Sequence, residues 1–338
     1  IGLISEDISR SISELESKSG EKIKDIIVSF SGEQISSINS TGSVIIRQKE
    51  VTARDVQSAL NMSSTLKVPN DKTLLYVSPN EYTIDGQPGI AEPIGMNGVR
   101  LEARTHLIYC SQNTKENISK CIEELNDLRI KKFYYNQLGA AESVLTKDQR
   151  ELGVCLLDIG AGTTDLTIYK GGSIRFSKVF PYAGDYITET IATSLKITST
   201  QAEEIKKKYG CAVLDSDSED TLRIKGTNGN KEIEISRKAL SEVIEQSLTR
   251  IIRHCAVCLE DNGMLSYMPT GYVLTGGTAN LEGVQKLGED LTKNNFEIGL
   301  PEVEKPYKSE QLIKPQFSPI LGTVSYTHLR AHETPEHL

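Results

Sequence analysis

The chain has 338 residues, enough for two domains of ordinary size, and a mean hydropathy of -0.31 that is typical of a globular protein. Its formal net charge of -8 argues against a nucleic-acid partner, because that kind of binding depends on basic residues. No apolar run is long enough to span a bilayer, no signal peptide opens the sequence, and the 6 scattered cysteines indicate a reducing compartment and not a disulfide framework.

The first half of the chain alternates helical and strand patterns. An amphipathic helix is predicted over residues 1–22 and a compact β-rich unit over 24–103. Within this unit, Thr52 and Asp55 form a capping box for a helix that ends near Leu66. The other elements expected in this half are strands at 26–31, 43–46, 74–77, 81–85, 99–108 and 133–135, and helices at 115–128 and 138–145.

The second half opens with a glycine-rich hairpin. An apolar strand ends at Asp158, and a turn with Gly160 and Gly162 follows. After Thr163 and Thr164 the chain returns to the period-two alternation of a strand. Walker-type loops and dinucleotide fingerprints continue into a helix, so this pattern excludes both.

The residue types at the tip of this hairpin suit a phosphate. Glycines allow a tight turn whose N–H groups form an anion-binding concavity, and the two threonines add hydroxyl donors. Asp158 is then expected to face a phosphate-bound Mg²⁺ through water. A lone G-x-G would favour an ordinary hairpin, whereas the complete string D-I-G-x-G-T-T-D favours the phosphate site.

Further elements follow the hairpin. They are a turn at 170–173, strands at 174–179 and 272–275, helices at 184–195, 200–209, 236–261 and 281–291, an acidic loop at 215–220, and a hairpin at 221–235 that closes at 226–229. Cys255 and Cys258, beside His254, have the spacing of half a metal site. Both cysteines fall on the apolar stripe of the 236–261 helix and no second pair exists, so buried structural cysteine is the better interpretation.

The end of the chain differs from the rest. Residues 325–338 contain His328, His332 and His337 but no periodic hydrophobic pattern, so no element is expected there. We interpret this segment as an artefactual tail appended after Val324.

Several motifs together resemble the FtsA family of bacterial cell-division proteins, which are actin-like ATPases. Besides the hairpin, the resemblance rests on Tyr-Ala-Gly-Asp at 182–185, Ala-Glu-Glu-Ile-Lys-Lys-Lys-Tyr-Gly at 202–210, Gly-Tyr-Val-Leu-Thr-Gly-Gly-Thr-Ala at 271–279 and Ile-Leu-Gly at 320–322. The segments 146–148 and 150–154 and the position of the β-rich unit are similar to FtsA in particular.

The resemblance implies an α/β fold: an actin-like (ribonuclease H-like) two-domain ATPase with an inserted β-rich subdomain. The implied boundaries are 1–23 and 104–150 for the first actin-like subdomain, 24–103 for the insert, 151–183 and 256–324 for the second actin-like subdomain, 184–255 for an FtsZ-binding subdomain, and 325–338 for the tail. The family's first phosphate loop, of the type D/E-x-G-T, does not precede residue 1, so the chain is expected to be an N-terminally truncated fragment.

The resemblance also implies the cofactors ATP and Mg²⁺. It places these residues around the nucleotide: Asp158, Gly160, Gly162, Thr163, Thr164, Gly184, Glu203, Lys206, Lys207, Gly276, Gly277, Thr278 and Gly322. Asp158 is also the implied Mg²⁺ ligand, through water, and Gln137 is the implied residue that orients the attacking water, with Asn136 a poorer substitute. Without the motif context, Glu203, Lys206 and Lys207 would be the solvated face of a helix.

The implied function is that of an ATP-binding protein with at most weak ATPase activity. It would link the FtsZ ring to the cytoplasmic face of the inner membrane at the septum, through a C-terminal amphipathic helix that the family has after this region. It would also recruit later division proteins and assemble with copies of itself. Its FtsZ-binding subdomain has a basic cluster suited to an acidic FtsZ peptide, formed by Lys206, Lys207, Lys208, Arg223 and Lys225.

Three other functions compete with this interpretation. An FtsA-like scaffold of pilus assembly is the nearest. A sugar or acid kinase would share the nucleotide cradle but needs a catalytic carboxylate in its first domain, for which 104–150 offers no candidate. A DnaK-type chaperone needs a peptide-binding domain that this sequence does not contain.

Overall fold

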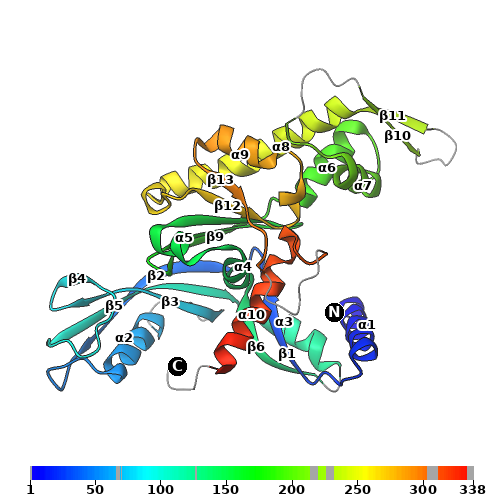
Figure 1. Cartoon of the computed structure of the whole chain (residues 1–338). Coiled ribbons are helices and arrows are strands. Elements are labelled where there is room, and N and C mark those ends of the chain that lie inside the picture. The colour runs from blue at the N-terminus through cyan, green and yellow to red at the C-terminus, as the bar shows by residue number, and fades with distance from the viewer. Residues whose placement is uncertain are drawn as a thin grey trace. The chain divides into compact units, whose positions relative to one another are not determined.

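The structure is a computed structural model that describes residues 2–65, 69, 71–125, 128–213, 220–225, 232–302 and 311–332. The chain divides into two compact units (Figure 1). Unit 1 contains residues 1–136 and 173–177, and unit 2 contains residues 137–172 and 178–338. Most of the predicted acidic loop, at 215–219, and the predicted hairpin closure at 226–229 lie outside the described residues.

Unit 1 contains two separate sheets. Strand β1 (Asp25–Phe30) pairs in parallel with β6 (Arg129–Tyr135). The second sheet is antiparallel, has the strand order β2-β5-β3-β4, and consists of β2 (Ser36–Ile45), β5 (Arg100–Ser111), β3 (Lys72–Ile84) and β4 (Gln87–Ile90). The sequence assigned the first strand to the insert at 24–103, but its backbone hydrogen bonds place it beside β6.

Strand β3 joins two strands that the sequence predicted separately. Its pairing with β5 is irregular between Pro79 and Glu81, as expected where a proline has no N–H to donate. The strand therefore continues through a bulge and does not end at the proline.

Three helices complete unit 1: α1 (Gly2–Ser19), α2 (Ala53–Thr65) and α3 (Gln112–Glu123). The predicted capping box of α2 is confirmed, since the Thr52 N–H donates to Asp55 Oδ2 at 2.9 Å and the Asp55 N–H donates to Thr52 Oγ1 at 3.3 Å. This helix packs against the antiparallel sheet, and the core between them consists of Ile46, Val51, Ala59, Tyr82, Ile84, Leu101 and Ala103.

A buried polar cluster joins this sheet to the start of β9 (Ser173–Phe180). The His106 ring on β5 lies with Nδ1 2.7 Å from Asn39 Oδ1 and Nε2 2.9 Å from Ser177 Oγ. The Ser37 hydroxyl donates to the Ser177 carbonyl at 2.8 Å. Burial lowers the pKa of His106 to about 4, so the ring is neutral around pH 7.

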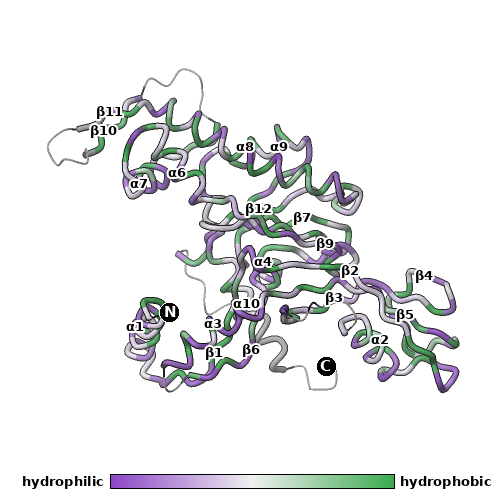
Figure 2. The backbone as a smooth tube through the Cα atoms, turned by 180° about the vertical axis from the view of Figure 1, so that it is seen from behind, coloured by the Kyte–Doolittle hydropathy of each residue, from purple (hydrophilic) through white to green (hydrophobic). Residues whose placement is uncertain are grey.

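Unit 2 is built on a five-stranded sheet with the order β13-β12-β7-β8-β9. Its strands other than β9 are β13 (Phe296–Ile298), β12 (Tyr272–Thr275), β7 (Val154–Ile159) and β8 (Thr164–Lys170). Strand β12 is parallel to both of its neighbours, whereas β7 and β8 are antiparallel, which confirms the predicted hairpin. Every residue of β7 and β12 is buried, and most are apolar (Figure 2).

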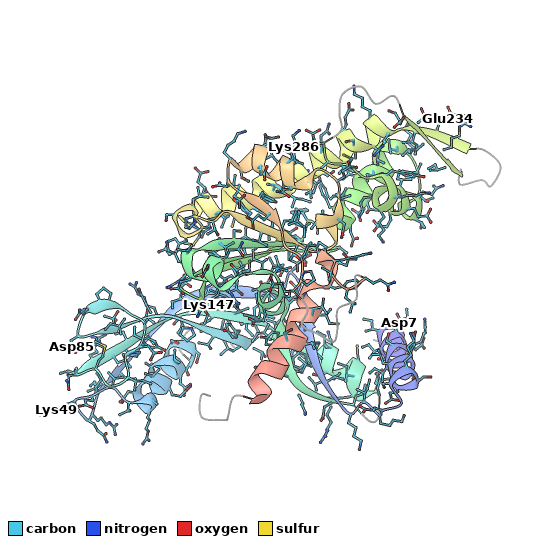
Figure 3. The ribbon with its side chains drawn as sticks, viewed as in Figure 1. Asp7, Lys49, Asp85, Lys147, Glu234 and Lys286 are labelled. Carbon is cyan, nitrogen blue, oxygen red and sulfur yellow. The ribbon has the colours of Figure 1, made fainter. Side chains whose placement is uncertain are left out.

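The helices of unit 2 cover this sheet and extend from it. They are α4 (Asn136–Val144), which begins at the last residue of unit 1, α5 (Lys147–Leu152), α6 (Gly184–Leu195), α7 (Ser199–Tyr209), α8 (Arg237–Asp261), α9 (Val284–Thr292) and α10 (Ser318–His332). A hairpin of β10 (Thr221–Lys225) and β11 (Glu232–Ser236) precedes α8. Charged side chains such as Lys147 and Lys286 point away from the body of the unit (Figure 3). Within the described ranges, no helix has both the length and the apolar character needed to cross a membrane.

Helix α10 is the largest departure from the sequence-based expectation. It continues through His332, and so enters the segment 325–338 in which no element was expected. The reason is local, because neither proline nor glycine occurs between Gly322 and Pro335 to end a helix that has already begun. Cys255 is buried on α8, as the structural interpretation of that residue predicts, and burial raises the pKa of its thiol.

Candidate functional site

The tip of the β7–β8 hairpin is a short turn with free donors. Asp158 and Asp165 face each other across the last pairs of the hairpin, and the Gly160 N–H closes the turn by donating to the Thr163 carbonyl at 3.0 Å. The next amides, those of Ala161, Gly162 and Thr163, donate no hydrogen bond to the described part of the chain. Three successive N–H groups at an exposed tip are the donor arrangement that binds phosphate oxygens.

The carbonyl groups of the tip are held by α6. The Gly184 N–H donates to the Gly160 carbonyl at 3.0 Å and the Asp185 N–H donates to the Ala161 carbonyl at 2.8 Å. Thr278 adds a hydroxyl donor to the Gly160 carbonyl at 3.3 Å. The first N–H groups of a helix have no partner within the helix, so here they satisfy the oxygens that would otherwise repel an anion.

The threonines of the hairpin are positioned by hydrogen bonds of their own. The buried Thr164 donates its hydroxyl to the Tyr182 carbonyl at 2.6 Å, and Thr163 donates to Asp165 Oδ2 at 3.0 Å. Thr164 therefore supports the turn before α6, whereas Thr163 lies at the tip. The sequence predicted both as phosphate donors, and the structure gives Thr164 a partner in the protein.

Asp158 is a buried carboxyl group next to a second one. It is 6% exposed, and burial, with a further contribution from Asp165, raises its pKa to about 7. A Cβ atom at Gly276 would lie 2.3 Å from Asp158 Oδ1, so glycine is required for the close approach of the two loops. Two neighbouring carboxylates are stabilised by a proton or a cation, and oxygen ligands are those that Mg²⁺ prefers, so this pair fits the ion that the sequence implied.

The predicted helix residues Glu203, Lys206 and Lys207 have different roles. Lys206 is buried, and its ammonium group lies 2.7 Å from Glu203 Oε2, whereas Lys207 is an exposed residue 3.0 Å from Glu203 Oε1. Burial raises the pKa of Glu203, but hydrogen bonds from Lys206, Thr188 and Lys207 outweigh it and lower the pKa to about 2. The solvated-face interpretation therefore holds for Lys207 and is wrong for Lys206.

Gly322 lies at a crossing of two helices. A Cβ atom there would be 1.7 Å from the Gly139 carbonyl oxygen of α4, so α10 and α4 approach too closely for any side chain. Ser143 of α4 also donates its hydroxyl to the Ser318 carbonyl at 2.8 Å. These contacts account for the glycine by helix packing; its contact with a nucleotide stays a prediction.

Gln137, the predicted catalytic residue, is fully buried in α4. Neither polar atom of its side-chain amide has a hydrogen-bond partner in the described part of the chain. Asn136, the alternative, accepts a hydrogen bond from the Ser29 hydroxyl at 2.9 Å. A buried amide without a partner is costly, and a bound water or ligand oxygen would satisfy it.

The structure brings most of the predicted residues into one connected cradle and adds two that the sequence analysis left out. The cradle comprises Asp158, Gly160, Gly162, Thr163, Thr164, Gly184, Gly276, Gly277 and Thr278, with Glu203, Lys206 and Lys207 joined to it through α6. Asp165 and Thr188 are the additions. The period-two alternation of the hairpin could have identified Asp165, because it places that residue opposite Asp158.

Comparisons with known proteins identify the family. A family model described as cell division protein FtsA matches residues 155–322, and one described as the SHS2 domain inserted in FtsA matches residues 32–109. Cell division protein FtsA of Pseudomonas aeruginosa is 38% identical over 297 residues, which cover 88% of this chain and 71% of that protein. This chain belongs to the FtsA family of cell division proteins. FtsA of Escherichia coli K12 is 33% identical over 327 residues, which cover 94% of this chain and 77% of that protein.

Solved structures confirm the predicted fold class of this FtsA-family chain. The PilM–PilN type IV pilus biogenesis complex matches with a TM-score of 0.65 at 18% identity, over 96% of this chain and 84% of that chain. MreB5 of Spiroplasma citri bound to ADP matches with a TM-score of 0.54 at 22% identity, over 66% of this chain and 67% of that chain. The fold is therefore actin-like α/β with an inserted domain, and it is the sequence relatives that decide the family.

Proposed function

We propose that this FtsA-family protein binds ATP with Mg²⁺ in the cradle at the tip of the β7–β8 hairpin. The observation that supports this most directly is the set of three amides at 161–163, which donate no hydrogen bond within the described residues and lie beside the buried carboxyl group of Asp158. The amides would hold phosphate oxygens, and Asp158 would face the metal ion. MreB5 structures of the same fold contain ADP or AMPPNP, which agrees with the proposal.

The nucleotide would control assembly and not drive a metabolic reaction. Gln137 would orient a water molecule, and its burial agrees with at most weak hydrolysis. The family relationship supports a role at the cytoplasmic face of the inner membrane at the septum, where the protein would link the FtsZ ring to the membrane and form filaments or oligomers with its own copies. The identity of 38% with an FtsA protein favours this role over pilus assembly, for which the likeness is one of fold.

FtsZ would dock on the subdomain at about 184–255, but with fewer cations than the sequence predicted. Lys206 is buried, and Arg223 lies 3.1 Å from Glu234 across the β10–β11 hairpin. The side chain of Lys225 lies outside the described residues. Lys207 and Lys208 are the exposed cations at the end of α7, so an acidic FtsZ peptide would contact these two.

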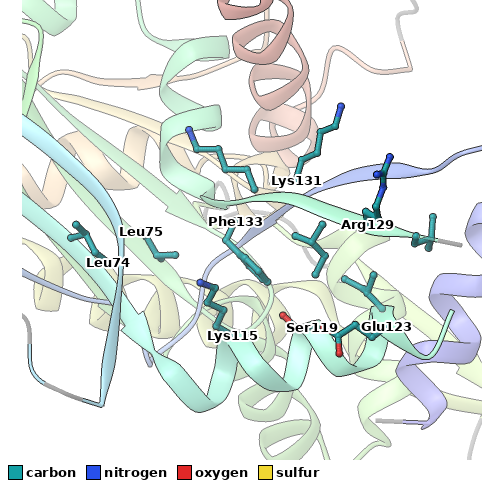
Figure 4. Close-up of a pocket in the computed structure, with 12 residues that line it drawn as sticks. Leu74, Leu75, Lys115, Ser119, Glu123, Arg129, Lys131 and Phe133 are labelled. Atoms are coloured by element: carbon teal, nitrogen blue, oxygen red, sulfur yellow. The ribbon is translucent and has the colours of Figure 1, made fainter. Parts of the chain in front are cut away.

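Recruitment of other division proteins would use a groove in unit 1. The groove has a volume of about 680 Å³ and runs along one side of β6, between α3 and the start of β3 (Figure 4). Its apolar floor is bordered by Lys115, Lys132 and one acidic residue, Glu123, and by Arg129 and Lys131, which are both paired with Asp25. The occupant that this chemistry favours is an extended acidic segment with apolar side chains.

The nucleotide part of the proposal is tested by Gly162→Asp. Gly162 is exposed and a Cβ atom there would meet nothing within 4 Å, so the variant should fold normally while its carboxylate repels phosphate. We expect ATP affinity to fall by about tenfold or more in calorimetry, which corresponds to ~1.4 kcal/mol. Ser266→Asp adds the same charge at an exposed site elsewhere in unit 2 and should bind ATP as the unaltered chain does. Equal affinities for the two variants would contradict the proposal.

The cell-division part is tested by co-sedimentation with FtsZ filaments. The protein should sediment with FtsZ, and reversing Lys207 and Lys208 to glutamate should weaken the interaction. Binding that is unchanged after this reversal would contradict the electrostatic part. Phosphorylation of a small sugar or acid, together with no binding to FtsZ, would favour the kinase alternative.

A further inference from the structure

Two exposed carboxamide side chains form a pair beside the phosphate cradle. Asn280 ends the short 3₁₀ helix η2 (Gly277–Asn280), which follows β12, and Gln316 lies in a second one, η3 (Pro315–Phe317), which precedes α10. The two short helices are joined at their starts by a backbone hydrogen bond of 3.3 Å. At the side chains, Asn280 Nδ2 donates to Gln316 Oε1 at 2.9 Å, so the two carboxamides are held together.

The carbonyl of Gly277 fixes the orientation of this pair. Asn280 Nδ2 also donates to that carbonyl at 2.9 Å, so both of its hydrogens are used within the chain. Turning the Asn280 carboxamide over would place its Oδ1 against the Gly277 carbonyl, and two acceptors repel each other. The pair therefore presents Asn280 Oδ1 as an acceptor and Gln316 Nε2 as a donor. Neither atom has a hydrogen-bond partner in the part of the chain that the structure describes.

Helix η2 leads from the hairpin tip to the end of α7. It begins beside the tip, since the Thr278 hydroxyl donates to the Gly160 carbonyl at 3.3 Å. It ends beside the segment that follows α7, where the Ala212 N–H donates to the Glu282 carbonyl at 2.7 Å. Gly277 is exposed and a Cβ atom there would meet nothing within 4 Å, so a flat ring has room along this helix. A nucleotide with its phosphates at the tip would therefore have its base next to the carboxamide pair.

The free acceptor and donor of the pair match adenine. Adenine has an amino group at position 6, which donates, and a ring nitrogen beside it, which accepts, and carboxamides bind these two atoms together. Guanine and hypoxanthine have a carbonyl oxygen at position 6, which would face Asn280 Oδ1 and be repelled. Because the phosphates fix one end of the nucleotide, the base cannot turn round to exchange these positions.

We propose that Asn280 and Gln316 select adenine, with Asn280 Oδ1 accepting from the 6-amino group and Gln316 Nε2 donating to the adjacent ring nitrogen. The inference rests on the proposed nucleotide function and adds base specificity to it. Neither residue is needed to hold the phosphates, so the effect of changing them should depend on the base alone.

The test compares three ligands on the full chain by calorimetry, each with Mg²⁺: ATP, inosine triphosphate (ITP), whose base carries a carbonyl at position 6, and tripolyphosphate. The unaltered chain should bind ATP roughly tenfold more tightly than ITP, because a pair of acceptors replaces a hydrogen bond. Asn280→Ala should bring this ratio close to one. Gln316→Ala should weaken ATP binding by roughly fivefold. Both variants should bind tripolyphosphate as the unaltered chain does.

Asn294→Ala is the matched control. Asn294 is exposed and precedes β13, which is parallel to β12, so it lies at the opposite end of the strands from η2 and should keep the ratio of the unaltered chain. Both Asn280 and Gln316 are exposed, so their variants should fold normally.

Three results would overturn base selection alone: equal binding of ATP and ITP by the unaltered chain, a ratio that survives in Asn280→Ala, or a matching loss of tripolyphosphate binding in either variant. The last result would mean that the pair supports the phosphate cradle and does not read the base. If the unaltered chain binds none of the three ligands, the proposed nucleotide function fails, and base selection fails with it.

Discussion

Asp158 should make the chain less stable as the pH rises through neutrality, and Asp158→Asn should remove this dependence. The pKa of Asp158 is raised from 3.8 to about 7 in the folded state, so the folded chain binds this proton more tightly than the unfolded chain. The resulting stabilisation is complete below the unfolded pKa and is lost as the pH rises through the folded one. At ~1.36 kcal/mol per pKa unit, the whole effect is about 4 kcal/mol.

About half of that effect falls in an accessible range. Between about pH 5.5 and about pH 8, the contribution of Asp158 to the free energy of unfolding should decrease by roughly 2 kcal/mol. The assay is urea denaturation at several pH values, without nucleotide and Mg²⁺, on the unaltered chain and on Asp158→Asn. The difference between the two chains isolates Asp158, because His106, whose dependence has the opposite sign, contributes equally to both.

Asp290→Asn is the matched control, since Asp290 is exposed on α9 and the same change of side chain is made there outside the buried pair of carboxyl groups. The reasoning would be refuted if the difference between the unaltered chain and Asp158→Asn were constant across this range. The reasoning would also be refuted if the free energy of unfolding of the unaltered chain increased relative to that of Asp158→Asn as the pH rose. That result would mean that the folded state stabilises the charged carboxylate.

Three further predictions concern stability. The unaltered chain should lose about 2 kcal/mol of its free energy of unfolding between about pH 7 and about pH 5, because the pKa of His106 is lowered to about 4 in the folded state and the unfolded chain binds the proton first. His106→Gln should remove this loss, and urea denaturation at both pH values measures it. Gly322→Ala should lower the free energy of unfolding by about 1–3 kcal/mol, because the new Cβ atom would overlap the Gly139 carbonyl. Gly277→Ala should be nearly neutral in the same assay, because the space around its Cβ atom is open. Thr52→Ala should cost about 1 kcal/mol through loss of the capping box, and an unchanged urea midpoint would contradict the role of that hydrogen bond.

Local sequence patterns determined the features of this protein that depend on neighbouring residues. The turn at Gly160 and Gly162 and the alternation on both sides of it predicted the β7–β8 hairpin, because both are properties of a few consecutive residues. The same holds for the capping box at Thr52 and Asp55. The order of these motifs along the chain also sufficed to predict the actin-like fold and the FtsA family.

Short elements escaped the sequence analysis because their patterns are too brief to be periodic. Helix α5 has six residues and β13 has three, and both are stabilised by the rest of unit 2 more than by their own residues. The pairing of β1 with β6 could not be predicted from local patterns either, since β6 begins about a hundred residues later in the chain. Backbone pairing over such a separation is decided by how the whole unit packs.

Only the tertiary structure decided what the site residues do. Lys206 and Lys207 are the same residue type at consecutive positions, yet α6 packs on one of them and leaves the other in solvent. The requirement for glycine at position 322 comes from the crossing of α10 and α4 at that point. The pKa of Asp158 depends on its burial and on Asp165 across the hairpin. Each of these properties is set by atoms that are distant in the chain and close in space, and no local pattern specifies that distance.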